Sequence, residues 1–419
     1  MRVFKFGGAS VKDAAAVKNV AAILRLFPNE KLVVVISAMG KTTNALERIT
    51  EATFTNRAAI ETLIAEIKKY HYSILEELFE DRSSQVYDEI ANAFVELDWA
   101  TEDEPTMNYD QAYDQIVSVG EIISTKIVSA YLTSVGINNR WQDARDFICT
   151  DNTYREGKVD WNATEMKAKE KLQFTTENIV VTQGFIGSTS ENFTTTLGRE
   201  GSDYTASIIA YTMNAEDVTI WKDVPGVLNA DPKYFEDTVM LSQLSYQDAI
   251  ELTYYGATVI HPKTIKPLQN KSIPLRVKSF LAPNNQGTVI DSNATHNAVP
   301  CFIFKTEQML ISISPKDFSF IVEENLSQLF SVFASCNLKI NLMQNSAISF
   351  SICVDNNEHK AEQLIEKLKQ EYRVLFNEKL ELITIRNYDQ ATIDRVSKGK
   401  IVILEQKSRT TIQLVVKSK

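Results

Sequence analysis

The sequence predicts an α/β protein in which a mainly parallel sheet is sandwiched between helices. A short strand at 3–6 ends at two glycines, and apolar residues then recur with helical spacing over 11–26. The continuous β-branched run at 32–36 is typical of a strand buried on both faces of a parallel sheet. Helical spacing returns over 43–65, and this alternation of strand and helix is the pattern of an α/β domain.

The alternation continues to about residue 300, which predicts one large sheet domain over residues 1–300. Residues 60–130 are expected to be largely helical, with an acidic break at 98–105 and one long amphipathic helix at 111–133. Further strands are predicted at 139–142, 147–149, 179–182, 218–221 and 273–277, and a helix is predicted at 243–252.

After residue 300 the pattern changes to that of two small α+β units. Ferredoxin-like β-α-β-β-α order is predicted over 301–375, with strands at 309–314, 340–343 and 348–354 and helices at 323–335 and 360–371. A second, shortened unit over 376–419 has strands at 380–386, 400–405 and 411–416, one short helix at 389–396, and no closing helix. The pair is interpreted either as a regulatory module or as a plain dimerisation appendage.

The length, net charge and cysteine pattern of the chain limit how many domains it has and which kinds of ligand and cellular location suit it. The chain has 419 residues, which is too long for one core and favours about two to four domains. Its net charge of −10 argues against binding to nucleic acid or to an anionic membrane surface. The four cysteines have no CxxC spacing, and the N-terminus is typical of a strand and turn rather than a signal peptide. No run approaches the roughly 20 apolar residues of a membrane helix, so we expect a cytoplasmic protein.

The most informative stretch is TLGREGSDYTAS at 196–207, which follows a strand-like run and opens an apolar helix. Free backbone N–H groups at the start of a helix bind anions, and the planar guanidinium of Arg199 matches a carboxylate or a phosphate. The same residues also suit a glycine turn followed by a helix that Asp203 caps. From this stretch alone, the anion site and the capped turn are equally favoured.

Two further turns follow the first two strands. Lys5 and the glycines Gly7 and Gly8 end the first strand, so the backbone could approach a phosphate closely while the lysine supplies charge. SAMGKTTN at 37–44 places small and hydroxyl residues at the carboxyl end of the second strand, where open α/β sheets bind ligands. The alternatives are an ordinary strand-end turn with an exposed lysine, and a strand-to-helix loop capped by Thr43 or Asn44.

A carboxylate and a charged loop complete the candidate residues. Glu121 lies in an otherwise apolar helical face, where it either holds a substrate ammonium group or faces solvent. The loop at 220–233 carries Lys222, Asp223 and Lys233 among turn residues, and it suits nucleotide contacts or ordinary Pro/Gly turns. The chain has no GxxxxGK[ST], GxGxxG or GxSxG motif, and its four histidines do not cluster.

Together these motifs resemble those of aspartate kinases, which have the amino-acid kinase fold. They stand in the order of that family: KFGGAS at 5–10, SAMGKTTN at 37–44, SVGE at 118–121, VTQGFIG at 181–187, TTTLGREGSDYTA at 194–206, IWKDVPGVLNADP at 220–232 and YGATVIHPKT at 255–264. The resemblance covers essentially the whole chain, and the C-terminal units resemble the tandem ACT domains of the family. It implies phosphorylation of L-aspartate by ATP to 4-phospho-L-aspartate, the first step towards lysine, threonine and methionine.

The resemblance implies roles for residues at the phosphoryl end of the site. Lys5 and the amides of Gly7 and Gly8 would hold the transferring phosphoryl group, with Mg²⁺ carried by ATP and no metal site in the protein. Asp203 would orient the site near the phosphates, and Ser37 would lie beside Lys5. The residues assigned to ATP are Lys5, Gly7, Gly8, Lys222, Asp223, Leu228, Lys233 and Thr258.

For the amino acid, the resemblance implies that Arg199 binds the α-carboxylate, Glu121 binds the α-ammonium group and Thr43 helps to seat the substrate. The nucleophile is a side-chain carboxylate that is already ionised at neutral pH, so no general base is required. Glu200 adds a negative charge beside this anion site, and we expect it to point to solvent.

Three positions of the kinase motifs depart from the family pattern. Ala9 stands where the family usually has threonine, and Leu228 stands in place of a tyrosine of the nucleotide loop. Thr258 stands in place of a common nucleotide-contacting lysine, for which Lys263 or Lys233 is a candidate substitute.

The C-terminal units also depart from the family. Ala347 stands where a glutamate would pair with the amine of a lysine effector, so threonine or no effector is expected rather than lysine. ACT units commonly pair across subunits, which predicts a homodimer or a higher homo-oligomer. Two alternative functions stay open: an amino-acid kinase with another carboxylate substrate, and a kinase-inactive regulator that binds an amino acid.

Overall fold

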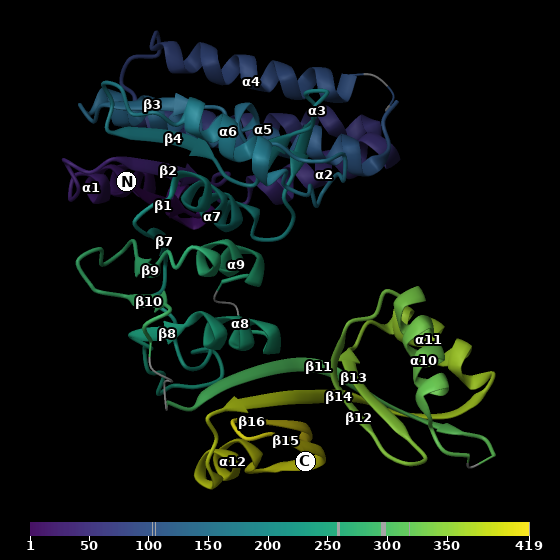
Figure 1. Ribbon diagram of the computed structural model, residues 1–419. Helices are drawn as coiled ribbons and strands as arrows, with labels where there is room; N and C mark the ends of the chain where they lie inside the picture. The colour runs from purple at the N-terminus through teal and green to yellow at the C-terminus, as the bar shows by residue number, and fades with distance from the viewer. Residues whose placement is uncertain (103, 105, 258–259, 295–298, 318, 419) are drawn as a thin grey trace. The chain divides into compact units, whose positions relative to one another are not determined.

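The computed structural model describes residues 1–419 except 103, 105, 258–259, 295–298, 318 and 419, and Figure 1 labels its elements. The chain forms two compact units that alternate along the sequence. The first comprises Met1–Val227, Met240–Ile250 and Val259–His296, and the second comprises Leu228–Val239, Glu251–Thr258 and Asn297–Lys419. Each unit has its own large sheet.

The first unit is built on an eight-stranded sheet in the order β3-β4-β2-β1-β7-β9-β10-β8. Neighbours from β3 to β9 are parallel, whereas β10 is antiparallel to β9 and parallel to β8. Strands β2 and β4 are buried along their whole length, which explains the continuous apolar sequence of β2 and of the first three residues of β4. The strands are β1 Arg2–Phe6, β2 Leu32–Ile36, β3 Asn139–Gln142, β4 Ile179–Gln183, β7 Val218–Lys222, β8 Gln243–Ser245, β9 Leu275–Ser279 and β10 Thr288–Asp291, and a separate pair is β5 Ile186–Ser188 with β6 Thr194–Thr196. The predicted, mainly parallel sheet is confirmed.

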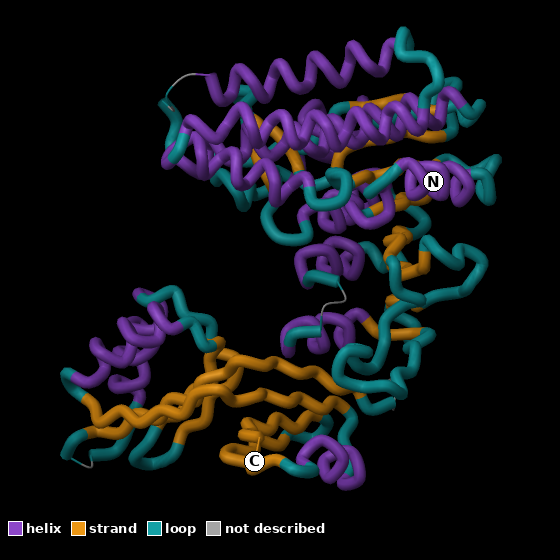
Figure 2. The backbone as a smooth tube through the Cα atoms, turned by 180° about the vertical axis from the view of Figure 1, so that it is seen from behind, coloured by secondary structure: helices purple, strands orange, loops and turns teal. Residues whose placement is uncertain are grey.

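Helices lie on both sides of this sheet (Figure 2). Helix α5 packs on α2, α4, β3 and β4, while α7 packs on β1 and β2 and contacts α6 and α9. The helices are α1 Ala14–Leu24, α2 Thr42–Thr55, α3 Ile60–Leu78, α4 Gln85–Glu102, α5 Tyr109–Ser134, α6 Trp161–Lys171, α7 Gly201–Met213, α8 Tyr246–Tyr255 and α9 Pro262–Asn270, with 3-10 helices at Gly8–Val11, Arg57–Ala59 and Ala144–Asp146.

Helix α5 is the central helix of the first unit and is more apolar than the sequence analysis expected. By length and composition alone, the most apolar window of α5 is long and apolar enough to cross a membrane. However, 78% of that window is buried inside the fold, which identifies α5 as a core helix. Gly120 allows α5 to approach α2, because an added Cβ would lie 2.9 Å from Leu46 Cδ1 and 3.1 Å from Thr42 Cγ2.

The acidic break predicted at 98–105 is wrong for residues 98–102, because α4 continues to Glu102. Asp98 forms an ion pair with Lys68 of α3 at 2.9 Å, so its negative charge has a partner on the neighbouring helix. The carbonyl groups of Thr101 and Glu102 accept hydrogen bonds from the guanidinium of Arg57 at 2.9 and 2.8 Å. Tertiary contacts therefore extend the helix through a segment whose composition favours a loop.

Other local differences concern the ends of strands. Residues 147–149 form only an isolated bridge at Cys149 rather than a strand. The first three residues of the helix expected at 243–252 instead form β8, because they pair with β10. The strand expected at 273–277 is β9, which begins after Pro274, a residue with no N–H to donate to the ladder.

The second unit is built on a six-stranded antiparallel sheet in the order β12-β13-β11-β14-β16-β15. Strands β11 and β14 are 15 residues long each and pair along most of their length, so one sheet runs through both halves of the unit (Figure 1). The elements are β11 Cys301–Pro315, α10 Glu323–Ser335, β12 Ile340–Asn345, β13 Phe350–Asp355, α11 Glu358–Lys369, β14 Tyr372–Arg386, α12 Gln390–Ser397, β15 Lys400–Lys407 and β16 Thr411–Ser418. This architecture is consistent with two ACT-like units, of which the second has a single helix. The predicted boundaries at 300 and 375 remain predictions, and β14 crosses the second of them.

One apolar core of the second unit contains a segment from the middle of the chain. Phe235, from Leu228–Val239, stacks on Phe302 of β11 with ring centroids 4.5 Å apart. The guanidinium of Arg395 on α12 lies 4.4 Å from the centre of the Phe235 ring. Although this segment lies within the 1–300 range, it packs with strands β14 and β16 in the second unit.

We expect Phe235→Ala to lower the free energy of unfolding of the second unit by about 3–5 kcal/mol, the usual cost of truncating a buried phenylalanine. Phe235 is 9% exposed, whereas its neighbour Tyr234 is 47% exposed and serves as the matched control. Tyr234→Ala should cost roughly 1 kcal/mol or less. Urea unfolding curves of the two variants measure the difference, and equal losses would contradict the core position of Phe235.

Candidate active site

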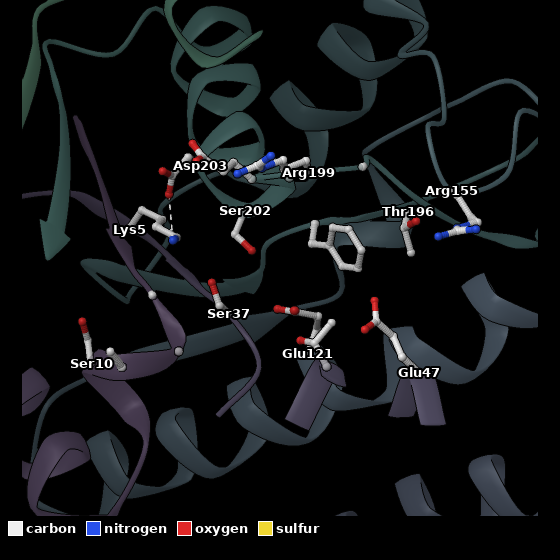
Figure 3. Close-up of a pocket in the computed structure, with 18 of the residues that line it drawn as sticks. Lys5, Ser10, Ser37, Glu47, Glu121, Arg155, Thr196, Arg199, Ser202 and Asp203 are labelled. Atoms are coloured by element: carbon white, nitrogen blue, oxygen red, sulfur yellow. Dashed lines mark ion pairs between the residues drawn. The ribbon is translucent and has the colours of Figure 1, made fainter. Parts of the chain in front are cut away.

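A pocket of about 870 Å³ lies in the first unit at the carboxyl ends of β1, β2 and β7, beside the start of α7 (Figure 3). The sequence-predicted residues that line it are Lys5, Gly7, Gly8, Ser37, Thr43, Glu121, Arg199, Asp203, Lys222 and Asp223. Leu228 and Lys233, which were assigned to ATP, belong to the second unit. Thr258 lies outside the described residues.

Lys5 and Asp203 form a buried ion pair at one end of this pocket (Figure 3). Lys5 comes from β1 and Asp203 from the first turn of α7, their charged atoms are 2.7 Å apart, and their side chains are 11% and 4% exposed. Lys222, at the end of β7, lies 3.9 Å from the other carboxylate oxygen of Asp203. A desolvated pair is favourable only with good geometry, so Asp203 fixes the position of the Lys5 ammonium group. That group lies beside Gly7, where an added Cβ would be 3.3 Å from Lys5 Nζ.

Two turns pack tightly together next to this ion pair. The Gly40 N–H donates to the Gly8 carbonyl at 3.1 Å. A Cβ added to Gly8 would lie 2.8 Å from the Ala38 carbonyl oxygen and 2.9 Å from that of Gly40, so only glycine fits there. Gly40 has a left-handed backbone with φ of 56°, and Lys41 rather than Thr43 occupies the capping position of α2. Ser37 and Thr43 of this turn line the pocket, whereas the buried Thr42 hydroxyl donates to the Met39 carbonyl at 2.6 Å.

Glu121 is buried in the pocket wall and does not face solvent, so the solvated alternative is wrong. Its residue exposure is 3%, and its Oε2 atom has no hydrogen-bond partner among the residues that the structure describes. Burial raises the pKa of Glu121 to about 8, against the opposing effects of the Ala38 backbone N–H and of the Lys5 charge. Figure 3 shows its carboxyl group directed into the pocket. A buried carboxyl group with a free oxygen suits a cationic ligand.

The turn before α7 has two residues with left-handed backbones. Gly198 and Glu200 have φ of 76° and 55°, and Arg199 between them is exposed at the pocket. Glu200 occupies the capping position of α7, and its carboxylate accepts the His261 N–H at 2.9 Å. The expectation that Glu200 points to solvent is therefore wrong. The alternative in which Asp203 caps the helix is also wrong, because its carboxylate contacts lysines instead.

Sequence reasoning missed several residues that line the pocket. Glu47 follows Thr43 by four residues on α2, and this spacing on one helical face could have indicated it. Tyr113 donates its hydroxyl to Glu47 at 2.7 Å. Arg155 and Phe185 also line the pocket outside regular elements. Phe185 lies in the VTQGFIG motif at 181–187, which could have indicated it, whereas no motif or periodicity marks Arg155.

Within the described part of the chain, no three His, Cys, Asp or Glu side chains gather in a group that could hold a metal ion. Mg²⁺ commonly binds one or two carboxylates together with substrate phosphates. The pocket carboxylates Asp203 and Asp223 match this kind of partial ligation, in which a nucleotide supplies the other oxygens.

We expect Glu121→Gln to stabilise the protein increasingly as the pH rises from 5 to 8. The folded state holds a proton on Glu121 up to a pKa of about 8, whereas an unfolded glutamate releases it near its ordinary value of 4.5, so wild-type stability falls across this window. The gain should reach on the order of 1–3 kcal/mol and level off above about pH 8.

The measurement is the free energy of unfolding in urea at several pH values. Glu51→Gln, at an exposed position of α2, is the matched control and should show no such trend. A stability difference for Glu121→Gln that does not change with pH would contradict the buried, protonated state.

Comparisons with known proteins agree with this geometry. Residues 1–279 match the amino acid kinase family. The chain is 30% identical to the lysine-sensitive aspartokinase 3 of Escherichia coli, over 96% of this chain and 90% of that relative. It is 32% identical to the chloroplastic aspartokinase 1 of Arabidopsis thaliana over 87% of this chain, and it spans 65% of the length of that relative.

The fold is also that of known aspartokinases. The solved structure of E. coli aspartokinase III in complex with lysine and aspartate matches 99% of this chain and 95% of its own, with a TM-score of 0.81 and 26% identity. An aspartate kinase from Clostridium acetobutylicum matches 100% of this chain and 96% of its own with a TM-score of 0.80 at 23% identity, which supports the fold. The chain therefore belongs to the amino acid kinase family and, within it, to the aspartokinases, which are phosphotransferases of amino-acid biosynthesis.

Proposed function

We propose that the chain transfers the terminal phosphoryl group of ATP to the side-chain carboxylate of L-aspartate, which forms 4-phospho-L-aspartate for lysine, threonine and methionine synthesis. The observation that carries this proposal is the combination of charged groups in one pocket: the Lys5 ammonium, the buried Glu121 carboxyl group and the exposed Arg199 guanidinium. These groups complement a phosphoryl group, an α-ammonium group and an α-carboxylate. A solved structure of E. coli aspartokinase III holds aspartate and ADP, which supports the same ligands here.

At the phosphoryl end, the residues position the reactants and neutralise their charge. Asp203 holds the Lys5 ammonium group beside Gly7, where it would contact an oxygen of the transferring phosphoryl group. The backbone of Gly7 and Gly8 would approach the same phosphate closely. Mg²⁺ bound to ATP supplies further neutralisation of charge. Because the attacking carboxylate is ionised at neutral pH, the reaction needs orientation and charge cancellation rather than a general base.

At the amino-acid end, Glu121 would receive the α-ammonium group through its unpartnered oxygen. Arg199 would bind the α-carboxylate with its planar fork, which is free to reorient because the side chain is exposed. Thr43 and Ser37, which also line the pocket, would seat the substrate. Placing the amino acid this way leaves its side-chain carboxylate directed towards Lys5.

For the nucleotide, Lys222 and Asp223 line the pocket and are proposed to contact ATP. Contacts from Leu228, Lys233 and Thr258 to ATP remain predictions from the family resemblance. Contacts from Leu228 and Lys233 would come from the loop that follows β7, and their removal should affect ATP rather than aspartate.

The C-terminal units are proposed to bind an amino-acid effector. E. coli aspartokinase III has been solved with lysine, but here Ala347 stands in the turn between β12 and β13, and its carbonyl accepts the Ile321 N–H at 2.9 Å. Because this turn has no carboxylate at 347, threonine or no effector is favoured over lysine. A homodimer or higher oligomer and a cytoplasmic location complete the proposal.

Trapping the acyl phosphate with hydroxylamine tests the proposed function. The purified chain is incubated with ATP, Mg²⁺ and a panel of amino acids, and the acyl-hydroxamate is measured. Aspartate should give the product. A product from another carboxylate amino acid alone would favour the other amino-acid kinases, and no product from any substrate would favour the kinase-inactive regulator.

Lys5→Ala should lower kcat by roughly 100- to 1000-fold, the usual cost of removing one group that stabilises charge in the transition state. The KM for aspartate should change much less, because Lys5 acts on the transferring phosphoryl group. Lys5→Arg keeps the charge and should recover part of kcat. Lys12→Ala, at an exposed position nearby, is the control, and an unchanged kcat in Lys5→Ala would refute the assigned role.

Arg199→Ala should raise the KM for aspartate about 10- to 100-fold, because it removes a charged hydrogen bond to the substrate carboxylate. The KM for ATP should change less than about twofold, and Arg199→Lys should fall between the wild type and Arg199→Ala. Initial rates in the hydroxamate assay give both constants. Equal effects on the two substrates would show that Arg199 does not act on the amino acid.

A further inference from the structure

We propose that Arg155 is a second recognition residue for the α-carboxylate of the amino-acid substrate, which it binds together with Arg199. The proposal rests on the function proposed above and adds a residue that lies in none of the motifs. Arg155 lines the same pocket, and Figure 3 shows it on the side of Thr196, away from the Lys5 end.

The backbone of Arg155 is held in a conformation that arginine rarely adopts. Its φ is 64°, in the left-handed region, which costs free energy for any residue with a Cβ. The Arg155 N–H donates to Asp114 Oδ2 at 2.9 Å. Asp114 is fully buried and also accepts the backbone N–H and the hydroxyl of Thr196, at 2.9 and 2.7 Å. One buried carboxylate therefore fastens the Arg155 loop to β6.

The same loop packs directly on the residue before Arg199. A Cβ added to Gly198 would lie 3.2 Å from the Arg155 carbonyl oxygen and 3.2 Å from Glu156 Cγ. Arg155, Gly198 and Glu200 all have left-handed backbones; Gly198 and Glu200 flank Arg199 in the chain, and Arg155 packs on Gly198. Strain of this kind persists only where the surroundings enforce it, and it concentrates at ligand sites. The arrangement presents two guanidinium groups from adjacent segments.

The guanidinium of Arg155 is held in place by its neighbours, but its present carboxylate partner can be replaced by a substrate. It lies 4.5 Å from the centre of the Tyr113 ring, and the Tyr113 hydroxyl is fixed by Glu47 at 2.7 Å. Its ion pair with Asp110 spans 3.3 Å, and the two side chains are 47% and 57% exposed. Exposed pairs of this type are weak, so a substrate carboxylate can replace Asp110, while the ring contact restricts the rotamers of Arg155.

The chemistry of the substrate explains the need for a second cation. The reacting side-chain carboxylate must lie near Lys5, which leaves the α-carboxylate farther along the pocket, on the side of Arg155 (Figure 3). Figure 3 draws the Arg199 guanidinium next to Asp203, so the exposed Arg199 side chain would reorient to share this carboxylate with Arg155. An ionised carboxylate has about four lone-pair positions, enough for two planar forks. Recognition by two guanidinium groups favours a free α-carboxylate strongly over a neutral α-amide.

Arg155→Asn tests the proposal, because asparagine tolerates the left-handed backbone and removes only the cation. We expect the KM for aspartate to rise about tenfold or more, as for loss of a charged hydrogen bond, with the KM for ATP changing less than about twofold. The preference for aspartate over aspartate α-amide, measured as the ratio of KM to the inhibition constant of the amide, should fall by a similar factor. Arg155→Lys should recover part of the loss.

Matched variants separate recognition from structure. Arg155→Gly keeps the favoured backbone and also removes the cation, so it should reproduce Arg155→Asn. Asp110→Asn frees the guanidinium and should leave the KM for aspartate unchanged or lower. Arg82→Asn removes an exposed arginine that pairs with Glu76, and it should change nothing.

Two results would overturn the proposal. One is a wild-type KM for aspartate and unchanged selectivity in both cation-free variants. The other is a joint change of kcat and both KM values, which indicates a structural role. Absence of aspartyl-hydroxamate with the wild-type chain would contradict the proposed function itself and is a separate outcome.

Discussion

The buried ion pair between Lys5 and Asp203 is the constraint on which the pocket depends. It joins β1 to the first turn of α7, and Lys222 of β7 lies next to it. A pair with so little solvent is favourable only when the sheet and the helix hold both groups at contact distance. The docking of α7 on β1 and β2 provides that support. The position of α7 in turn fixes the turn that carries Arg199.

Close approaches between backbones build the rest of the site. Gly8 lets the first turn touch the second, and Gly120 lets α5 approach α2. The close packing of α5 on α2 places Glu121 in the pocket wall. On a surface helix, the same carboxyl group would have stayed solvated. Both contacts are possible only because glycine has no side chain. The shape of the pocket therefore depends on Gly8 and Gly120 as much as on its charged groups.

Most of the fold and most of the candidate site could be predicted from the sequence, and the failures have physical causes. Buried parallel strands and helices have strong periodicity. Lys5 and Arg199 lie in motifs at the ends of strands and helices, and Glu121 stands out as a carboxylate within the apolar helix α5. The length of α4 could not be predicted, because partners on other helices stabilise its acidic end. Arg155 could not be predicted either, because its place depends on a hydrogen bond from a loop to a carboxylate 41 positions away.

The proton on Glu121 gives ligand binding a thermal signature. A buried carboxyl group whose pKa is about 8 is largely protonated at neutral pH. An ammonium group that takes its place beside that oxygen favours the ionised form, so each binding event expels close to one proton into the buffer. The heat measured by calorimetry then includes the heat of protonating the buffer. Titrations in buffers of different ionisation enthalpy would therefore give different apparent enthalpies at the same affinity.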